Sequence, residues 1–201
     1  MIWDFELPYR KERFPLCGID EAGRGPLCGP VVAGAVILPD GFDVSALNDS
    51  KKLSESKREA LYESIVSSCD WGVGIATAEE IDAYNILNAT YLAMCRAAEG
   101  LKQAPNFALI DGNRIPKGLQ IPAEAVVKGD AKCPSISAAS VIAKVTRDRI
   151  MKQLALQYPQ YELEKHKGYP TKEHYRKLLE HGIAPIYRKS FLKNLDKHRE
   201  D

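Results

Sequence analysis

The sequence is poor in the features that mark secreted proteins, membrane proteins and proteins stabilised by a zinc site. No apolar run approaches the roughly 20 residues that a membrane-spanning helix needs. The N-terminus carries acidic residues where a secretion signal would carry basic ones, so we expect no such signal. The five cysteines are odd in number, widely spaced and without a C-x-x-C pair, which argues against a disulfide framework and a zinc site. We therefore expect a cytoplasmic protein with its cysteines in the core.

Internal repeats and low-complexity segments are also absent, and at 201 residues the chain is long enough to bury one good core. Hydrophobic residues make up 45% and charged residues 27%, close to the average for soluble proteins. We predict a single domain over residues 1–201, with residues from about 160 to 201 forming a basic helical C-terminal extension. The tail has no heptad pattern, so we expect a monomer.

The net charge of +1 conceals an uneven distribution of charge along the chain. Residues 1–143 carry 14 basic and 19 acidic side chains, whereas residues 144–201 carry 14 basic and 8 acidic ones. A basic segment next to an acidic centre is typical of proteins that bind a polyanion, although a solvated helical face gives the same count. The charge distribution alone therefore makes a nucleic-acid partner about as well supported as its absence.

Strand-like and helix-like segments alternate along the chain, which predicts an α/β protein with a mixed central sheet flanked by helices. The first strand ends at Ile19 and forms a hairpin with a second strand. Ser54 is the expected N-cap of a helix. The second strand of this hairpin is expected at 31–38, and further strands are expected at 71–77, 107–110 and 125–128. The other expected helices are 86–101, 137–150 and 171–181.

Acidic residues follow three of these strands. Asp20 and Glu21 come after the first, Asp111 after the strand 107–110, and Asp130 after the strand 125–128. The side chains of neighbouring strand residues point to opposite faces, so Asp20 and Glu21 converge only if the strand ends there. Four carboxylates in one place repel one another unless a cation neutralises them, and hard oxygen ligands favour Mg²⁺ or Mn²⁺. The pattern predicts a two-ion site for phosphoryl transfer.

Each acidic residue also has an ordinary structural interpretation. Asp111-Gly112 is a common turn pair, Asp130 could cap the helix that follows, and Glu21 could be a solvated charge. Their joint occurrence after three strands favours function. Arg24 stands between Gly23 and Gly25, which leaves its side chain little cover and favours contact with a ligand.

The glycine-rich turn does not match either common nucleotide-binding motif. The phosphate-binding loop needs lysine and a hydroxyl residue where the chain has Arg24 and Gly25, and the dinucleotide motif fails at Cys28. Neither ATP nor NAD is indicated. The histidines His166, His174 and His181 do not have metal-ligand spacing, and we expect them on or beside surface helices.

Taken in order, the chain resembles bacterial ribonuclease HII, the type 2 ribonuclease H family. The matching segments span nearly the whole chain and are Gly18-Ile19-Asp20-Glu21-Ala22-Gly23-Arg24-Gly25-Pro26, Asn48-Asp49-Ser50-Lys51-Lys52-Leu53, Leu109-Ile110-Asp111-Gly112-Asn113, Val127-Lys128-Gly129-Asp130, Ile136 to Asp148, and His166-Lys167-Gly168-Tyr169-Pro170-Thr171. The resemblance implies a ribonuclease H-like fold with metal-binding, catalytic carboxylates at Asp20, Glu21, Asp111 and Asp130.

The resemblance also implies a substrate and a way to recognise it. The backbone of Gly23-Arg24-Gly25 would contact the 2′-hydroxyl of a ribonucleotide, and Tyr169 would pack on the deoxyribose that follows it. The enzyme would hydrolyse RNA in RNA-DNA hybrids and cut 5′ to single ribonucleotides in duplex DNA, leaving 3′-hydroxyl and 5′-phosphate ends. Candidate phosphate contacts are Lys51, Lys52, Lys128, Lys144, Arg147 and Lys167, although basic residues are usually just solvated. Without the resemblance, Tyr169 is more often a loop aromatic packed on the core.

Two other functions remain open from the sequence. A non-catalytic nucleic-acid-binding module would have the basic segment, but four carboxylates would repel its phosphates. A related metal-dependent DNA nuclease of the same fold would keep the carboxylates, but it would have no use for the glycine-arginine-glycine turn and Tyr169.

Overall fold

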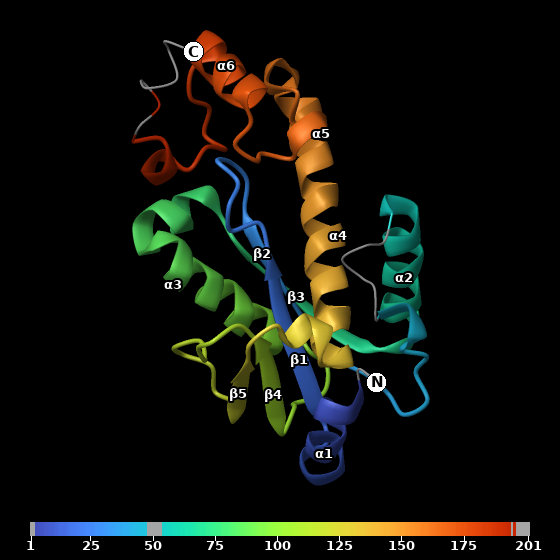
Figure 1. The fold of residues 1–201 in the computed structure, drawn as a ribbon. Coiled ribbons are helices and arrows are strands. Elements are labelled where there is room, and N and C mark those ends of the chain that lie inside the picture. Colours follow the sequence, from blue (N-terminus) through green and yellow to red (C-terminus); the bar gives the residue numbers. More distant parts are fainter. Residues whose placement is uncertain (1–2, 48–53, 194, 196–201) are drawn as a thin grey trace.

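The computed structural model describes residues 3–47, 54–193 and 195, and its centre is a five-stranded sheet (Figure 1). The strand order is β3-β2-β1-β4-β5. β1 pairs antiparallel with β2, and β2 with β3, whereas β1–β4 and β4–β5 are parallel pairs. The sheet is therefore mixed, as predicted. The strands are β1 Leu16–Ala22, β2 Val31–Ile37, β3 Asp70–Ala76, β4 Phe107–Asp111 and β5 Ala123–Val126.

Helices cover both faces of this sheet. The α-helices are α1 Trp3–Arg13, α2 Glu55–Ser68, α3 Ala78–Glu99, α4 Pro134–Gln157, α5 Leu163–His166 and α6 Lys172–His181. Short 3₁₀ turns are η2 Gly129–Ala131, η3 Pro159–Tyr161 and η4 Lys189–Phe191. The hairpin and the helices α2, α3, α4 and α6 were expected, but α1 was not.

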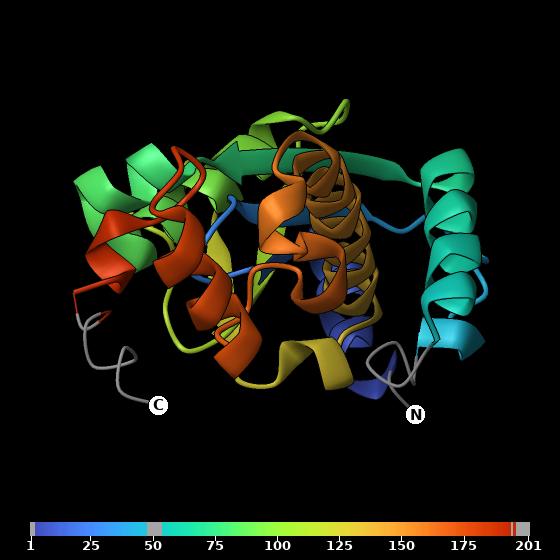
Figure 2. The ribbon, with the colours of Figure 1, turned by 90° about the horizontal axis from the view of Figure 1, so that it is seen from above.

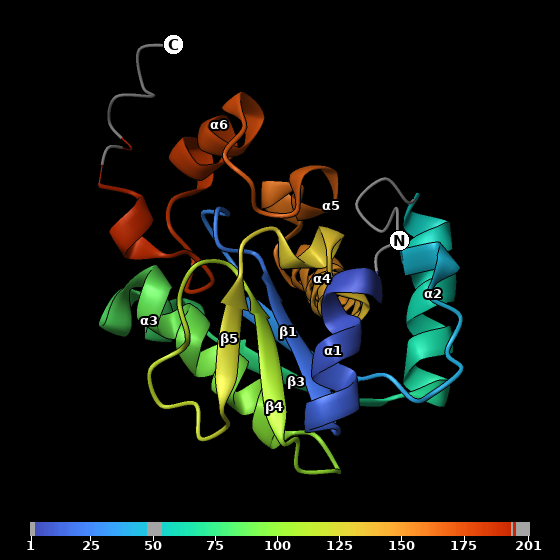
Figure 3. The same cartoon turned by 60° about the horizontal axis from the view of Figure 1, so that its bottom comes forward.

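The two longest helices pack on opposite faces because the β2 side chains alternate. Ala33 and Ala35 join the core cluster beneath α3, whereas Val36 joins the cluster beneath α4. Figures 1 and 3 show α3 on one side of the sheet and α4 on the other, and Figure 2 shows α2 outermost, beyond α4. Glycines permit the close approach: a Cβ on Gly74 would lie 1.9 Å from the Ala93 carbonyl oxygen of α3.

Local capping sets the helix boundaries. Ser54 accepts a hydrogen bond from Lys57 N and begins α2, as predicted. Thr77 and Glu80 form a capping box that begins α3 well before the expected residue 86. The backbone of Asn85, with φ 67°, kinks α3. The apolar stripe therefore marked only the part of α3 after the kink.

Helix α1 supports the start of α4 through a buried carboxylate. Glu6 has no exposed surface, and its Oε2 accepts hydrogen bonds from Ser135 N at 2.9 Å and from Ser135 Oγ at 2.8 Å. A carboxylate is favourable there because the first amides of a helix lack partners and carry partial positive charge. Burial nevertheless raises the pKa of Glu6.

The elements from η3 to η4, called the C-terminal extension below, pack on the C-terminal end of α4 and on the loop between β1 and β2. Their core contains Tyr161 and Leu178 together with Leu27 from that loop and Met151 from α4. An isolated bridge joins Cys28 to Tyr187. The extension therefore meets the β1–β2 loop directly. No helix in the described part of the chain is long and apolar enough to cross a membrane.

Candidate active site

Asp20 and Glu21 lie within β1 rather than after its end. The strand continues to Ala22 because β2 still pairs with all three residues, so the expected strand end at Ile19 was wrong. The pairing with β4, however, stops at Ile19 and Ile110. From Asp20 onward β1 therefore pairs only with β2 and no longer with β4. The two carboxylates lie where β1 and β4 separate.

Asp111 is the residue next to Asp20 across this division, since each follows the last residue that pairs β1 with β4. Its Oδ1 accepts a hydrogen bond from Gly129 N at 2.7 Å. This bond fixes the η2 turn, which carries Asp130. The predicted strand 125–128 ends earlier, at Val126, so Asp130 comes from a 3₁₀ turn and not from a strand end. A Cβ on Gly129 would lie 2.5 Å from Ile136 Cδ1, so the Ile136 side chain would have to shift for a larger residue.

These four carboxylates influence one another electrostatically. Asp20 is only 7% exposed, and burial followed by the charges of Glu21, Asp111 and Asp130 raises its pKa. Burial also raises the pKa of Glu21, while its bond to Arg24 opposes the shift. The charges of residues from β1, β4 and the η2 turn therefore act on Asp20, and the four carboxylates are called the acidic centre below.

The donor set fits a hard divalent cation. All four side chains offer carboxylate oxygens, and a cation would offset the repulsion from Glu21, Asp111 and Asp130 that adds to burial in raising the pKa of Asp20. As the side chains stand, no three carboxylate, imidazole or thiol groups in the described ranges form a cluster that could hold a metal ion. The carboxylates therefore approach one another without enclosing an ion, and part of its coordination would come from water or substrate oxygens.

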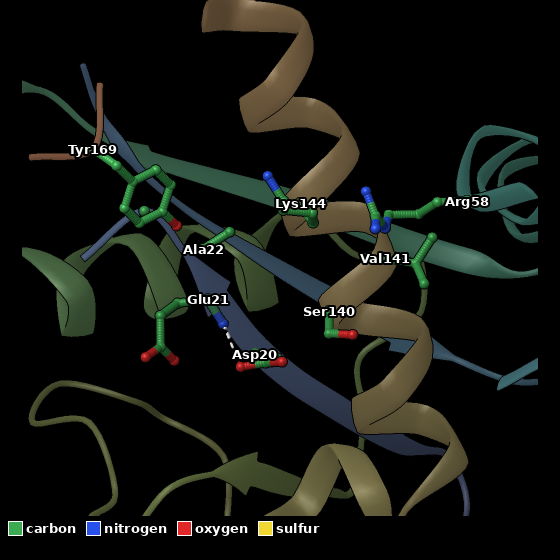
Figure 4. Close-up of a pocket in the computed structure, with 9 residues that line it drawn as sticks. Asp20, Glu21, Ala22, Arg58, Ser140, Val141, Lys144 and Tyr169 are labelled. Carbon is green, nitrogen blue, oxygen red and sulfur yellow. Dashed lines mark hydrogen bonds between the residues drawn. The ribbon is translucent and has the colours of Figure 1, made fainter. Parts of the chain in front are cut away.

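The acidic centre lies between two hollows. One, of about 300 Å³, is lined by Asp20, Glu21, Lys144 and Tyr169 among others (Figure 4). The other, of about 360 Å³, lies on the α3 side and is lined by Glu21, Arg24 and Asp111 together with residues of α3 and of the segment after β4. Figure 4 shows Lys144 and Ser140 reaching the first hollow from α4, and Tyr169 facing them from the loop before α6. A chain-like substrate could pass over the carboxylates from one hollow to the other.

The glycine-arginine-glycine turn borders both hollows. Gly23 has φ +94°, which favours glycine. The Arg24 side chain is 50% exposed, and its Nη1 lies 3.2 Å from Glu21 Oε1. Tyr169 is 43% exposed and lines the first hollow, so it is not the core-packed loop aromatic that the sequence left open. A Cβ on Gly25 would lie 3.8 Å from the Tyr169 ring, so the turn and the tyrosine are neighbours.

The predicted phosphate contacts occupy different environments. Lys144 is half-buried beside the acidic centre and pairs with Asp148, and Lys167 lies 3.0 Å from Asp148 Oδ2. Lys128 is exposed at the start of η2. Arg147 was predicted wrongly: it is fully buried and donates to the carbonyls of three residues, Pro30, Lys167 and Cys28. Lys51 and Lys52 lie outside the described residues.

The sequence did not predict the buried positions of His174 and Arg188. His174 is fully buried rather than on the surface, and it stacks on His166 with ring centroids 4.0 Å apart. Arg188 is fully buried against the β1–β2 loop. Neither has a motif signal, because their importance comes from contacts between segments that lie far apart in the chain. Arg58 of α2 and Ser140 of α4 also line the first hollow.

Comparison with known proteins identifies relatives of this chain. The sequence model of the family described as Ribonuclease HII matches residues 17–194. A ribonuclease HII of Neisseria meningitidis serogroup C is 58% identical over 175 residues, covering 87% of this chain and 90% of that protein. One from Paracoccus denitrificans is 55% identical over 176 residues, covering 88% and 84%. The crystal structure of ribonuclease H2 from Pyrococcus horikoshii OT3 superposes with a TM-score of 0.76 at 30% identity, covering 92% of this chain and 97% of that one.

Proposed function

The chain belongs to the ribonuclease HII family, and we propose that it cuts duplex DNA 5′ to single ribonucleotides as well as the RNA strand of RNA-DNA hybrids. It is an endoribonuclease of this family. The observation that best supports the finer proposal is the position of the Gly23–Gly25 turn and Tyr169 at the acidic centre. A pure DNA nuclease would need neither feature. We further propose that it acts in the cytoplasm, as a monomer.

Asp20, Glu21, Asp111 and Asp130 would hold two Mg²⁺ or Mn²⁺ ions. When bound, such ions supply an activated water and stabilise the oxygen that leaves phosphorus. The bond between Asp111 and Gly129 keeps the η2 turn, and with it Asp130, in place against β4. Arg24 forms an ion pair with Glu21 and offsets part of its negative charge. The products would carry 3′-hydroxyl and 5′-phosphate ends.

Substrate recognition would come from groups above the carboxylates. The backbone of the exposed residues Arg24 and Gly25 would contact the 2′-hydroxyl, which is the group that distinguishes RNA from DNA. The Tyr169 ring would pack on the deoxyribose that follows the ribonucleotide. Lys144 lines the first hollow, and Lys167 shares its partner Asp148. Both would contact phosphates, which position the duplex without reading its sequence.

The test is cleavage of three labelled duplexes in Mg²⁺: all-DNA, DNA with one ribonucleotide, and RNA-DNA hybrid. We expect cuts in the hybrid and one cut 5′ to the ribonucleotide, with ends identified by their mobility and by ligation. Asp111→Asn should abolish cleavage, whereas Asp43→Asn, the same change in the exposed loop after β2, should not. Cleavage of the all-DNA duplex, or cutting of the hybrid alone, would contradict the proposal.

A further inference from the structure

Arg188 joins the C-terminal extension to the glycine-arginine-glycine turn through hydrogen bonds from all three of its guanidinium nitrogens. Its side chain is fully buried. The bonds are Nη2 to the carbonyl oxygen of Gly23 at 2.7 Å, Nη1 to those of Arg24 at 3.0 Å and Pro26 at 2.7 Å, and Nε to that of Gly29 at 2.9 Å. Every acceptor is a backbone carbonyl of the loop between β1 and β2. One side chain, about 160 residues away in the sequence, therefore binds four carbonyl groups of this loop.

These bonds determine where the amides of the turn point. In a trans peptide the C=O and N–H groups point in opposite directions. Because the carbonyls of Gly23 and Arg24 face the buried guanidinium, the amides of Arg24 and Gly25 face away from it. Both residues are exposed, and within the described part of the chain neither amide has an acceptor. The two amides are thus available to a ligand above the turn.

A hydrogen bond at one end of a peptide group also strengthens the donor at its other end. A charged donor on the carbonyl polarises the peptide, so the amide beyond it becomes a better donor. The peptides from Gly23 to Arg24 and from Arg24 to Gly25 each have this arrangement. A ribose hydroxyl oxygen is one acceptor that such amides bind.

A second buried arginine adds to the effect. A Cβ on Gly23 would lie 2.0 Å from Arg147 Nε, so Arg147 lies directly beneath the turn. Its Cζ atom lies 5.8 Å from the centroid of the Tyr169 ring. Within the described residues neither arginine forms an ion pair with a carboxylate. Two unpaired positive charges therefore lie under the predicted hydroxyl-reading turn.

Attachment of the C-terminal extension does not by itself explain a buried guanidinium. The backbone already joins the two segments, through Leu27 N to Gly168 O, Gly29 N to Ile186 O and Arg188 N to Leu27 O. Burying a charge is costly, and well-packed apolar residues often stabilise a core as well or better. Burial, and next the charge of Arg147, lower the pKa of Arg188 to about 9. A feature that costs stability in this way is expected where function needs it.

We propose that Arg188 is a positioning residue that orients and polarises the amides of Arg24 and Gly25, so that they donate to the 2′-hydroxyl oxygen of the ribonucleotide. This inference rests on the proposed function. Arg188 itself would not touch the substrate. It would act through the backbone of the turn and would affect recognition of the ribose more than binding of the duplex, because phosphate contacts supply most duplex affinity.

The test compares Arg188→Met, which removes the donors, with Arg188→Lys, which keeps the charge but has no fork to reach four carbonyls. Ile65→Ala, in the core between α2 and α4, is the control for a general loss of stability. We expect Arg188→Met to lower kcat/KM for the single-ribonucleotide duplex about 10²-fold, the lower end of the loss seen when a donor to the transition state is removed. Arg188→Lys should fall between Arg188→Met and wild type. Duplex affinity, measured by fluorescence anisotropy without a catalytic metal, should change less than threefold.

Amide NMR signals of Arg24 and Gly25 give a readout that does not depend on activity. In Arg188→Met both signals should shift or broaden, and in Ile65→Ala they should stay in place. If wild type cuts the ribonucleotide but Arg188→Met cuts equally well, or no worse than Ile65→Ala, the inference is overturned and the proposed function stands. If wild type does not cut at the ribonucleotide, the proposed function fails, and the claimed role in reading the hydroxyl fails with it.

Discussion

Acid should destabilise this protein through His174, a buried histidine that supports the loop of Tyr169. The carbonyl oxygen of Tyr169 lies 2.9 Å from His174 Nδ1 and can only accept, so Nδ1 carries the proton. His174 Nε2 is then free to accept from the Tyr187 hydroxyl, also at 2.9 Å. A second proton on Nε2 would remove this acceptor and place a charge in the core. Burial, with a smaller contribution from His166, lowers the pKa of His174 to about 4.

The sign and size of the effect follow from proton linkage. The unfolded chain binds the proton near the ordinary pKa of 6.5, whereas the folded protein binds it only near about 4. The contribution of neutral His174 to the free energy of unfolding is therefore fully present above pH 6.5, and it is lost as the pH falls from 6.5 to 4. This difference corresponds to about 3 kcal/mol in total, of which about 1.4 kcal/mol is lost at pH 5.5.

Urea unfolding at pH 7.5 and pH 5.5 measures this loss. His174→Asn does not titrate and can still donate an amide hydrogen to Tyr169. Wild type should lose about 1.4 kcal/mol more than His174→Asn between the two pH values. His181→Asn, on the same helix but partly exposed, should behave like wild type. An equal loss in wild type and His174→Asn would refute the reasoning, because the other titrating groups contribute to both.

Two further predictions concern packing and phosphate contact. Gly74→Ala would place a Cβ 1.9 Å from the Ala93 carbonyl oxygen, so α3 must move and the protein should lose about 3 kcal/mol or more in urea unfolding. An unchanged urea midpoint would contradict this packing. Lys144→Gln should weaken duplex binding similarly for ribonucleotide-containing and all-DNA duplexes and reduce the salt slope by about 1. A selective loss for one of these duplexes would show that Lys144 is not a phosphate contact.

The sequence predicted the elements whose signals are local. The alternation of apolar strands and helical stripes identified the mixed sheet, and Ser54 marked the start of α2. The four acidic positions were found because each follows an apolar run, although the boundaries differed. β1 extends to Ala22 because β2 pairs with it there, and pairing between strands is not visible in one strand's own residues.

Features that depend on contacts between distant segments could not be predicted. Arg147 looked like an exposed basic residue on α4, yet it is buried by segments from both ends of the chain. Arg188 has no motif of its own, because its role comes from carbonyls that precede it by about 160 residues. Glu6 of α1 likewise acquires its place only when α4 packs beside it.

The central claim is that the four carboxylates form one metal-dependent centre for cutting next to a ribonucleotide. Its most direct test is the single-turnover cleavage rate of a duplex with one ribonucleotide, measured against Mg²⁺ concentration for wild type and Asp130→Asn. We predict no cleavage without a divalent ion, a saturable rise in the wild-type rate, and a rate for Asp130→Asn at least about 10²-fold lower at saturating Mg²⁺. Cleavage that persists in a chelator, or an Asp130→Asn rate equal to that of wild type, would contradict the account.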